Sequence, residues 1–164
     1  MLIAATSPIT QSVALASPVA YSLVGSISSL GPLTAARWLR APGSLVLTAL
    51  VAGLLAMPFT ALGFLILVAL GLPAFIGELV LLAGAFYTRP RQTVWYAAAA
   101  AYALVLFAIS LAVIDPAVMS PWVVILTLGG RMLSILVLAA LAVRIEKALM
   151  RSGLRRRPVG GGTP

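Results

Sequence analysis

The chain has 164 residues, of which 62% are apolar and only 9% are charged, with 11 basic and 3 acidic side chains. Soluble domains carry charge on about a quarter of their residues, so this composition excludes a water-coated globular domain and an intrinsically disordered chain. Long apolar runs instead predict an all-α protein: a polytopic transmembrane helical bundle of four to five spans, one of them short or broken.

The first apolar segment covers about residues 11–30 and is rich in serine. Ser22, Ser26 and Ser29 recur at helical spacing and so form one small, hydroxyl-lined face, against which another helix can pack closely. We expect the segment to span the membrane, with a weakly inserted interfacial helix as the alternative. No Lys or Arg precedes it, as a secretory signal would require, so cleavage is not expected. Gly31-Pro32 is expected to end the helix.

The next apolar stretch, residues 44–86, is too long for one span and about right for two. The favoured turn is Gly71-Leu72-Pro73, because glycine and proline together interrupt helices. This turn leaves a short segment over 74–86, which we expect to be a half-helix packed inside protein. The alternative places the turn at Met57-Pro58 and makes residues 59–86 one long, kinked helix.

Two further spans are predicted over residues 93–114 and 122–143, joined by a loop without Lys or Arg. Arg131 lies within the second of these spans, near mid-membrane. Residues 151–164 are basic and rich in glycine and proline, which predicts a disordered cytoplasmic tail. A single transmembrane helical domain is expected to occupy residues 1–150.

Basic residues gather in the loops and the tail on one side of this arrangement. Arg37 and Arg40 follow the first segment, and Arg89 and Arg91 follow the third. The positive-inside rule places this side in the cytoplasm of a cell-membrane protein, with the N-terminus outside and the C-terminus inside. The same rule explains the net charge of +8, so no nucleic-acid partner is expected. Anionic lipid head groups are the expected contacts of Arg144, Lys147, Arg151, Arg155, Arg156 and Arg157.

The composition also excludes several chemistries. The chain has no cysteine and no histidine, which removes thiolate nucleophiles, the usual zinc sites, His-ligated haem and Ser-His-Asp triads. Its acids, Glu78, Asp115 and Glu146, lie on different segments, and Glu146 beside Lys147 is expected on a solvated interfacial face. We therefore expect no enzyme activity, no catalytic residue, no metal and no cofactor.

Glu78 is the most informative single residue, because burying a carboxylate in hydrocarbon is costly and marks functional positions. It is a candidate for a proton or ion pathway, since burial can raise the pKa of a carboxyl group. A structural ion pair or a wet position near the surface is the alternative. Glu78 and Arg131 are also expected to form one buried ion pair, because each charge alone would be costly within a span.

A local resemblance adds to this interpretation. Gly71-Leu72-Pro73-Ala74-Phe75-Ile76-Gly77-Glu78-Leu79, followed by Leu82-Ala83-Gly84-Ala85-Phe86, resembles the antiporter-like proton-channel subunits of respiratory complex I and the Mrp-type cation/proton antiporters. The likeness extends weakly over residues 57–114. It implies that Glu78 lies on a proton route. The chain is too short for a complete pump of that family, and the intramembrane lysines of the family have no match, because Lys147 lies past the last span.

The functional expectation is a small integral membrane subunit of a larger complex that contributes to proton or cation translocation, with other membrane subunits as partners. One alternative is a structural or stabilising accessory protein without transport activity. Another is a small transporter or channel that forms by oligomerisation.

Overall fold

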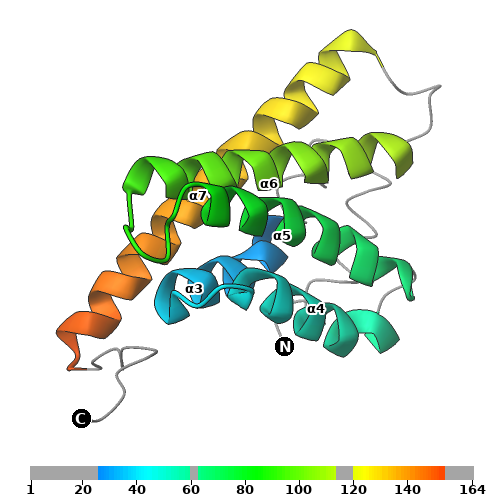
Figure 1. The fold of residues 1–164 in the computed structure, drawn as a ribbon. Helices are drawn as coiled ribbons and strands as arrows, with labels where there is room; N and C mark the ends of the chain where they lie inside the picture. Colours follow the sequence, from blue (N-terminus) through cyan, green and yellow to red (C-terminus); the bar gives the residue numbers. More distant parts are fainter. Residues whose placement is uncertain (1–25, 60–62, 114–119, 154–164) are drawn as a thin grey trace.

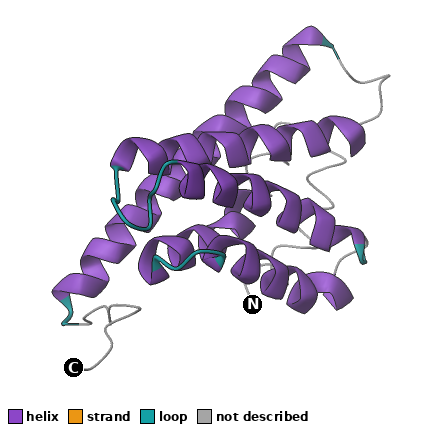
Figure 2. Ribbon diagram, in the orientation of Figure 1, coloured by secondary structure: helices purple, strands orange, loops and turns teal. Residues whose placement is uncertain are grey.

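The computed structural model describes residues 26–59, 63–113 and 120–153, and all of the regular structure in these ranges is helical (Figures 1 and 2). In chain order the elements are the 3-10 turn η1 (Ile27–Ser29), α3 (Leu30–Leu39), α4 (Ser44–Ala56), the 3-10 turn η2 (Met57–Phe59), α5 (Leu65–Ala83), α6 (Gln92–Val113) and α7 (Pro121–Arg151). The predicted all-α helical bundle is therefore confirmed.

The α-helices form a closed ring. Each of α3, α4, α5, α6 and α7 packs against the next in sequence, and α7 packs back against α3. Figure 1 shows α4, α5 and α6 running side by side in alternating directions, with α7 crossing α6 obliquely. We call this arrangement the helical ring. Its closure brings the first and the last described helices into contact.

The surface of the helical ring has the character of a lipid-facing protein. In the part of the chain that the structure describes, α5, α6 and α7 are long and apolar enough to cross a membrane, whereas the apolar α4 is shorter. Large apolar side chains are exposed on these helices, among them Leu65, Val68, Leu104, Ile125 and Val137. Small and aromatic side chains fill the interior, including Ala74, Ala98, Ala139, Trp95 and Tyr102. Small residues allow the close helix packing that is usual in membranes.

The favoured turn at Gly71-Leu72-Pro73 is wrong. These residues lie inside α5, which continues through them from Leu65 to Ala83. Membrane helices tolerate an internal proline, because neighbouring groups can satisfy the backbone carbonyl that it frees. The alternative turn is confirmed, since α4 ends at Ala56 and the 3-10 turn η2 follows over Met57–Phe59. The short apolar helix is therefore α4, and the expected half-helix over 74–86 is not observed.

Two other boundaries also differ from expectation. Gly31-Pro32 does not interrupt the chain but lies in the first turn of α3, where the missing N–H of proline costs no helical hydrogen bond. The basic stretch after it is helical as far as Leu39, and Arg40 ends α3 in a left-handed conformation with φ of 47°. Helix α6 matches its predicted range closely. Helix α7 starts where expected and runs on to Arg151.

One end of the helical ring collects the basic residues. The α3–α4 connection, the α5–α6 connection and the C-terminus of α7 all lie at this end, on the left in Figure 1. We call it the basic end, and its basic residues are Arg37, Arg40, Arg89, Arg91, Arg144, Lys147 and Arg151. The predicted grouping of the basic segments on one side agrees with this arrangement. Residues 1–25, Asp115, and 154–164 with Arg155–Arg157 lie outside the described residues.

The orientation of the basic end in the membrane can be tested with single cysteines, because the chain has none of its own. Thr88 is exposed at the basic end, and Ser120 is exposed at the opposite end, before α7. We expect a membrane-impermeant maleimide added to intact cells to label Ser120→Cys and to leave Thr88→Cys unlabelled until the cells are permeabilised. Labelling of Thr88→Cys in intact cells would contradict the assignment of the basic end to the cytoplasm.

Candidate functional site

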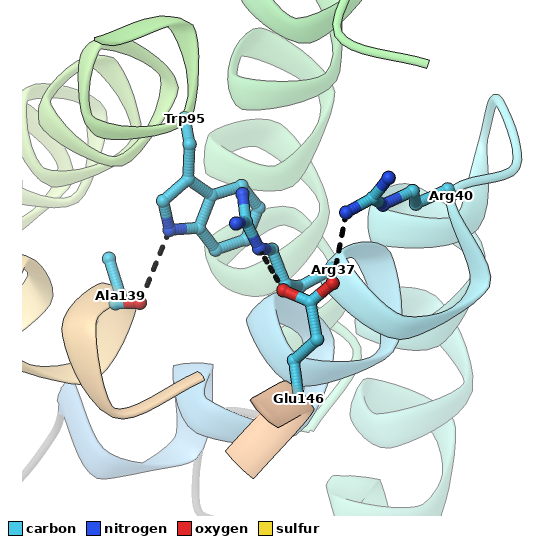
Figure 3. A network of polar contacts seen from close by, with 5 residues as sticks. All are labelled: Arg37, Arg40, Trp95, Ala139 and Glu146. Atoms are coloured by element: carbon cyan, nitrogen blue, oxygen red, sulfur yellow. Dashed lines mark hydrogen bonds and ion pairs between the residues drawn. The ribbon is translucent and has the colours of Figure 1, made fainter. Parts of the chain in front are cut away.

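The first buried charged centre ties α7 to α3 (Figure 3). Glu146 has only 3% of its side chain exposed, and one of its oxygens accepts a hydrogen bond from Arg37 Nε at 2.5 Å. Its other oxygen accepts one from Arg40 Nη2 at 3.0 Å. The expectation that Glu146 lies on a solvated face is wrong, because α7 continues past the predicted end of the span and packs against α3 at this level.

Aromatic rings complete this Glu146 centre. The Arg37 guanidinium lies 5.4 Å from the centre of the Phe86 ring and 5.3 Å from that of Trp95, within the range of cation–π attraction. The Trp95 indole N–H donates to the carbonyl oxygen of Ala139 at 3.2 Å (Figure 3). One arginine thus joins α3 to α7, to the start of α6 and to the α5–α6 connection. These contacts hold the helices together, which indicates a structural role for the Glu146 centre.

The second centre is built around Glu78, near the end of α5. Glu78 Oε1 accepts hydrogen bonds from the backbone N–H of Gly43 at 2.8 Å and from the Tyr87 hydroxyl at 2.5 Å. Oε2 accepts one from the backbone N–H of Leu45 at 3.2 Å. Helix α4 has no side-chain cap of its own, and a carboxylate is the favoured group at a helix N-terminus. Glu78 therefore caps α4 from the neighbouring helix.

Tyr87, in the α5–α6 connection, is the side-chain donor to Glu78. Two causes raise the pKa of Tyr87 above its ordinary value: burial of its phenol, which is the larger, and the hydrogen bond to Glu78. A phenol that stays protonated is a steady donor to the Glu78 carboxylate. Both oxygens of Glu78 accept hydrogen bonds from groups that fix the start of α4, which is the geometry of a structural cap.

The third centre lies around Arg131 on α7, which is 4% exposed. Its Nη2 donates to the Ser110 hydroxyl of α6 at 2.9 Å, and its Nη1 donates to the Ser26 hydroxyl, just before η1, at 3.3 Å. Ser110 in turn donates to the carbonyl oxygen of Leu106 at 2.8 Å. The serine face predicted from the sequence thus contacts another helix at Ser26, while Ser22 lies outside the described residues.

Further hydroxyl groups surround Arg131. Thr127 lies one turn before it on the same buried face of α7. The Tyr102 hydroxyl of α6 lies close to that of Ser29 and within electrostatic reach of Arg131. None of the hydroxyls of Thr127, Tyr102 and Ser29 completes a hydrogen bond with a described residue, although all three side chains are buried. This Arg131 centre is the candidate functional site.

The structure does not bring Glu78 and Arg131 together, so the predicted ion pair is replaced by separate partners. The prediction assumed that the helix of Glu78 starts at Ala74. Helix α5 instead starts at Leu65, so Glu78 lies about 20 Å from its start, at 1.5 Å per residue, and near the basic end. Arg131 lies much farther than Glu146 from the basic end of α7.

The structure shows where the residues of the predicted lipid contacts lie, but it does not test the contacts themselves. Arg144, Lys147 and Arg151 are exposed at the basic end, where a lipid head group can reach them. Within residues 26–59, 63–113 and 120–153, no cluster of acidic side chains could hold a metal ion. Sequence analysis missed the buried role of Glu146 and the hydroxyls around Arg131. Only the four-residue spacing from Thr127 to Arg131 signalled a shared face.

Comparison with known proteins gives a fold and not a family. No family model matches the sequence, and no curated protein matches it. Among solved structures, the crystal structure of an S-component of an ECF transporter shares the fold with a TM-score of 0.73. The match has 24% sequence identity and covers 84% of this chain and 70% of that chain.

This match corrects the resemblance drawn from the sequence. The fold is that of an ECF transporter S-component, and not that of the antiporter-like subunits of complex I or of Mrp-type antiporters. The motif around Glu78 is therefore a local likeness in a different fold. The match and the three described helices that are long and apolar enough to cross a membrane agree with a membrane location. The protein that shares the fold is a component of a transporter.

Replacing Glu78 tests its role as a cap. Glu78→Gln places an amide where three donors now meet a carboxylate, and it should lower the free energy of unfolding in detergent by about 1–3 kcal/mol. Tyr87→Phe removes one of those donors and should cost about 1 kcal/mol. Arg89→Gln, on an exposed arginine of the same connection, is the matched control and should leave stability nearly unchanged. Full stability of Glu78→Gln, together with a loss of proton or cation flux in proteoliposomes, would restore the ion-pathway hypothesis.

Proposed function

We propose that this chain is the membrane-embedded component of a solute transporter. The observation that carries the proposal is the fold shared with an S-component of an ECF transporter, at a TM-score of 0.73 over 84% of the chain. At 24% identity the likeness concerns the fold, so the activity is inferred and the residues must support it independently.

The distribution of buried polar groups supports the proposal. Two of the three buried centres, around Glu146 and Glu78, lie at the basic end and hold helices together. The third places Arg131 inside the ring, farther from that end, bonded to the hydroxyls of Ser26 and Ser110 and near further buried hydroxyl groups. Charged and polar groups inside a membrane bundle are costly and tend to line solute pathways. A purely structural accessory protein has no need of such a centre.

Membrane partners are part of the same proposal. The protein that shares the fold is one component of a transporter, so we expect this chain to assemble with further membrane subunits. We also propose anionic lipid contacts for the exposed Arg144, Lys147 and Arg151 at the basic end. Catalysis is not part of this role. The chain would provide the path or the binding site for the solute within the membrane.

The experiment combines uptake with purification. Cells that lack the protein should take up at least one solute of a defined medium more slowly, and the wild-type chain should restore the rate. Purification of the tagged full-length chain from native membranes in mild detergent should recover the same membrane subunits in a fixed ratio in every preparation. The proposal would be overturned by identical uptake profiles, measured by mass spectrometry of the spent medium, from a chain that purifies alone.

A further inference from the structure

The Arg131 centre lies inside the bundle, at the end of α6 that faces away from the basic residues. Ser110, which binds Arg131, is three residues before Val113, where α6 ends, or about 5 Å at 1.5 Å per residue. η1 and α7 contribute the rest of the centre and pack against each other. A solute approaching from the side opposite the basic end would meet this centre before either of the glutamate centres.

The guanidinium of Arg131 is arranged for oxygen ligands. Its two terminal nitrogens each hold a separate hydroxyl oxygen, Nη2 that of Ser110 and Nη1 that of Ser26. These are the nitrogens that bind two oxygens of one carboxylate or phosphate in a bidentate pair. Serine hydroxyls can rotate to donate instead of accept. An oxyanion bound at these two nitrogens would therefore accept both hydrogen bonds from the arginine.

The hydroxyls near Arg131 point to a ligand independently of the arginine. Tyr102 is 0% exposed and Thr127 is 1% exposed. The Thr127 hydroxyl has no hydrogen-bond partner among the described residues, and the Tyr102 hydroxyl lies close to that of Ser29 without a well-formed hydrogen bond. The buried hydroxyl of Ser29 shares this condition. Leaving a buried polar group unsatisfied is destabilising, and phenylalanine or valine would fill the same space without that cost. Such a set of donors is explained if they bind an acceptor that is present when the protein works.

We propose that Arg131, with the hydroxyls of Tyr102 and Thr127, forms a binding site for the oxyanion group, carboxylate or phosphate, of a small solute. The assignment rests on the proposed transport function and names the chemical class of the solute. Arg131 supplies the charge and the bidentate geometry, and the hydroxyls of Tyr102, Thr127 and Ser29 supply further donors. The glutamate centres at the basic end take no part in it.

The test is the thermal unfolding of the purified full-length chain in detergent. Sodium succinate, sodium phosphate and sodium chloride are compared at equal ionic strength. We expect succinate or phosphate to raise the unfolding temperature in a saturable manner relative to chloride, because a ligand that binds only the folded state stabilises it. A rise with succinate alone assigns a carboxylate site, and a rise with phosphate alone assigns a phosphate site. No rise with either oxyanion overturns the proposal.

Variants separate binding from general stability. Arg131→Gln should abolish the oxyanion-dependent rise, whereas Arg91→Gln, at an exposed arginine of the basic end, should preserve it. Tyr102→Phe and Thr127→Val should melt in chloride at or above the wild-type temperature, because each removes an unsatisfied hydroxyl, yet should bind the oxyanion about tenfold more weakly. These two variants keep the test decisive even if Arg131→Gln does not fold. The proposal fails if either melts well below wild type in chloride, or if both keep wild-type affinity for the oxyanion.

The outcomes also separate this proposal from the transport function. Slower uptake in cells without the protein, combined with no oxyanion-dependent rise, would retain the transporter and reject the Arg131 site. A saturable rise that depends on Arg131, combined with unchanged uptake of every solute, would retain the site and reject the transporter.

Discussion

The hydrogen-bonded ion pair between Arg37 and Glu146 closes the helical ring. The two residues are 109 positions apart, and they join the first α-helix that the structure describes to the last. Helix α3 is short, its one charged residue is Arg37 in the last turn, and Arg40 is its C-cap. A buried ion pair stabilises only when its geometry is good and its remaining groups are well placed. Here Arg40 holds the second oxygen of Glu146, so both carboxylate oxygens are paired, and two aromatic rings lie within cation–π range of Arg37.

The need to pair buried polar groups within the bundle also explains the Glu78 centre. Helix α4 starts at Ser44 in a part of the bundle where its first N–H groups have no capping side chain from their own segment. In a membrane, backbone groups without a partner are costly, so the cap has to come from within the protein. Glu78 supplies it from α5. Two of the three acidic residues of the chain are thus used to fasten the basic end, and Arg131 lies apart from them in the interior.

Much of the fold was predictable from composition and periodicity. The membrane class, the range of α6 and the start of α7 follow from long apolar runs that end at polar residues. The continuation of α5 through Gly71-Leu72-Pro73 was not predictable, because these residues break helices in water but are tolerated inside a membrane helix. That error moved the predicted start of α5 and placed Glu78 at the wrong level. It also favoured a resemblance that depended on a turn before Glu78.

The candidate site was predictable only in part. Arg131 and the serine face containing Ser26 both stand out in the sequence, because charge and small hydroxyls are unusual within apolar segments. That they meet could not be predicted, since 105 residues separate them and the contact depends on closure of the ring. Glu146 was misplaced because a charged residue beside Lys147 at the end of a span is usually solvated. Its burial results from α3 packing against α7, which no local pattern records.

The most direct test of this account is a double-mutant cycle on Arg37 and Glu146, measured as the free energy of unfolding of the full-length chain in detergent. Arg37→Met and Glu146→Leu should each cost about 3–5 kcal/mol, because each leaves the partner charge buried. The double variant should lose much less than the sum of the two, since apolar side chains then meet where the ion pair was. Strictly additive losses would show that the two residues do not interact, and would contradict closure of the ring through this pair.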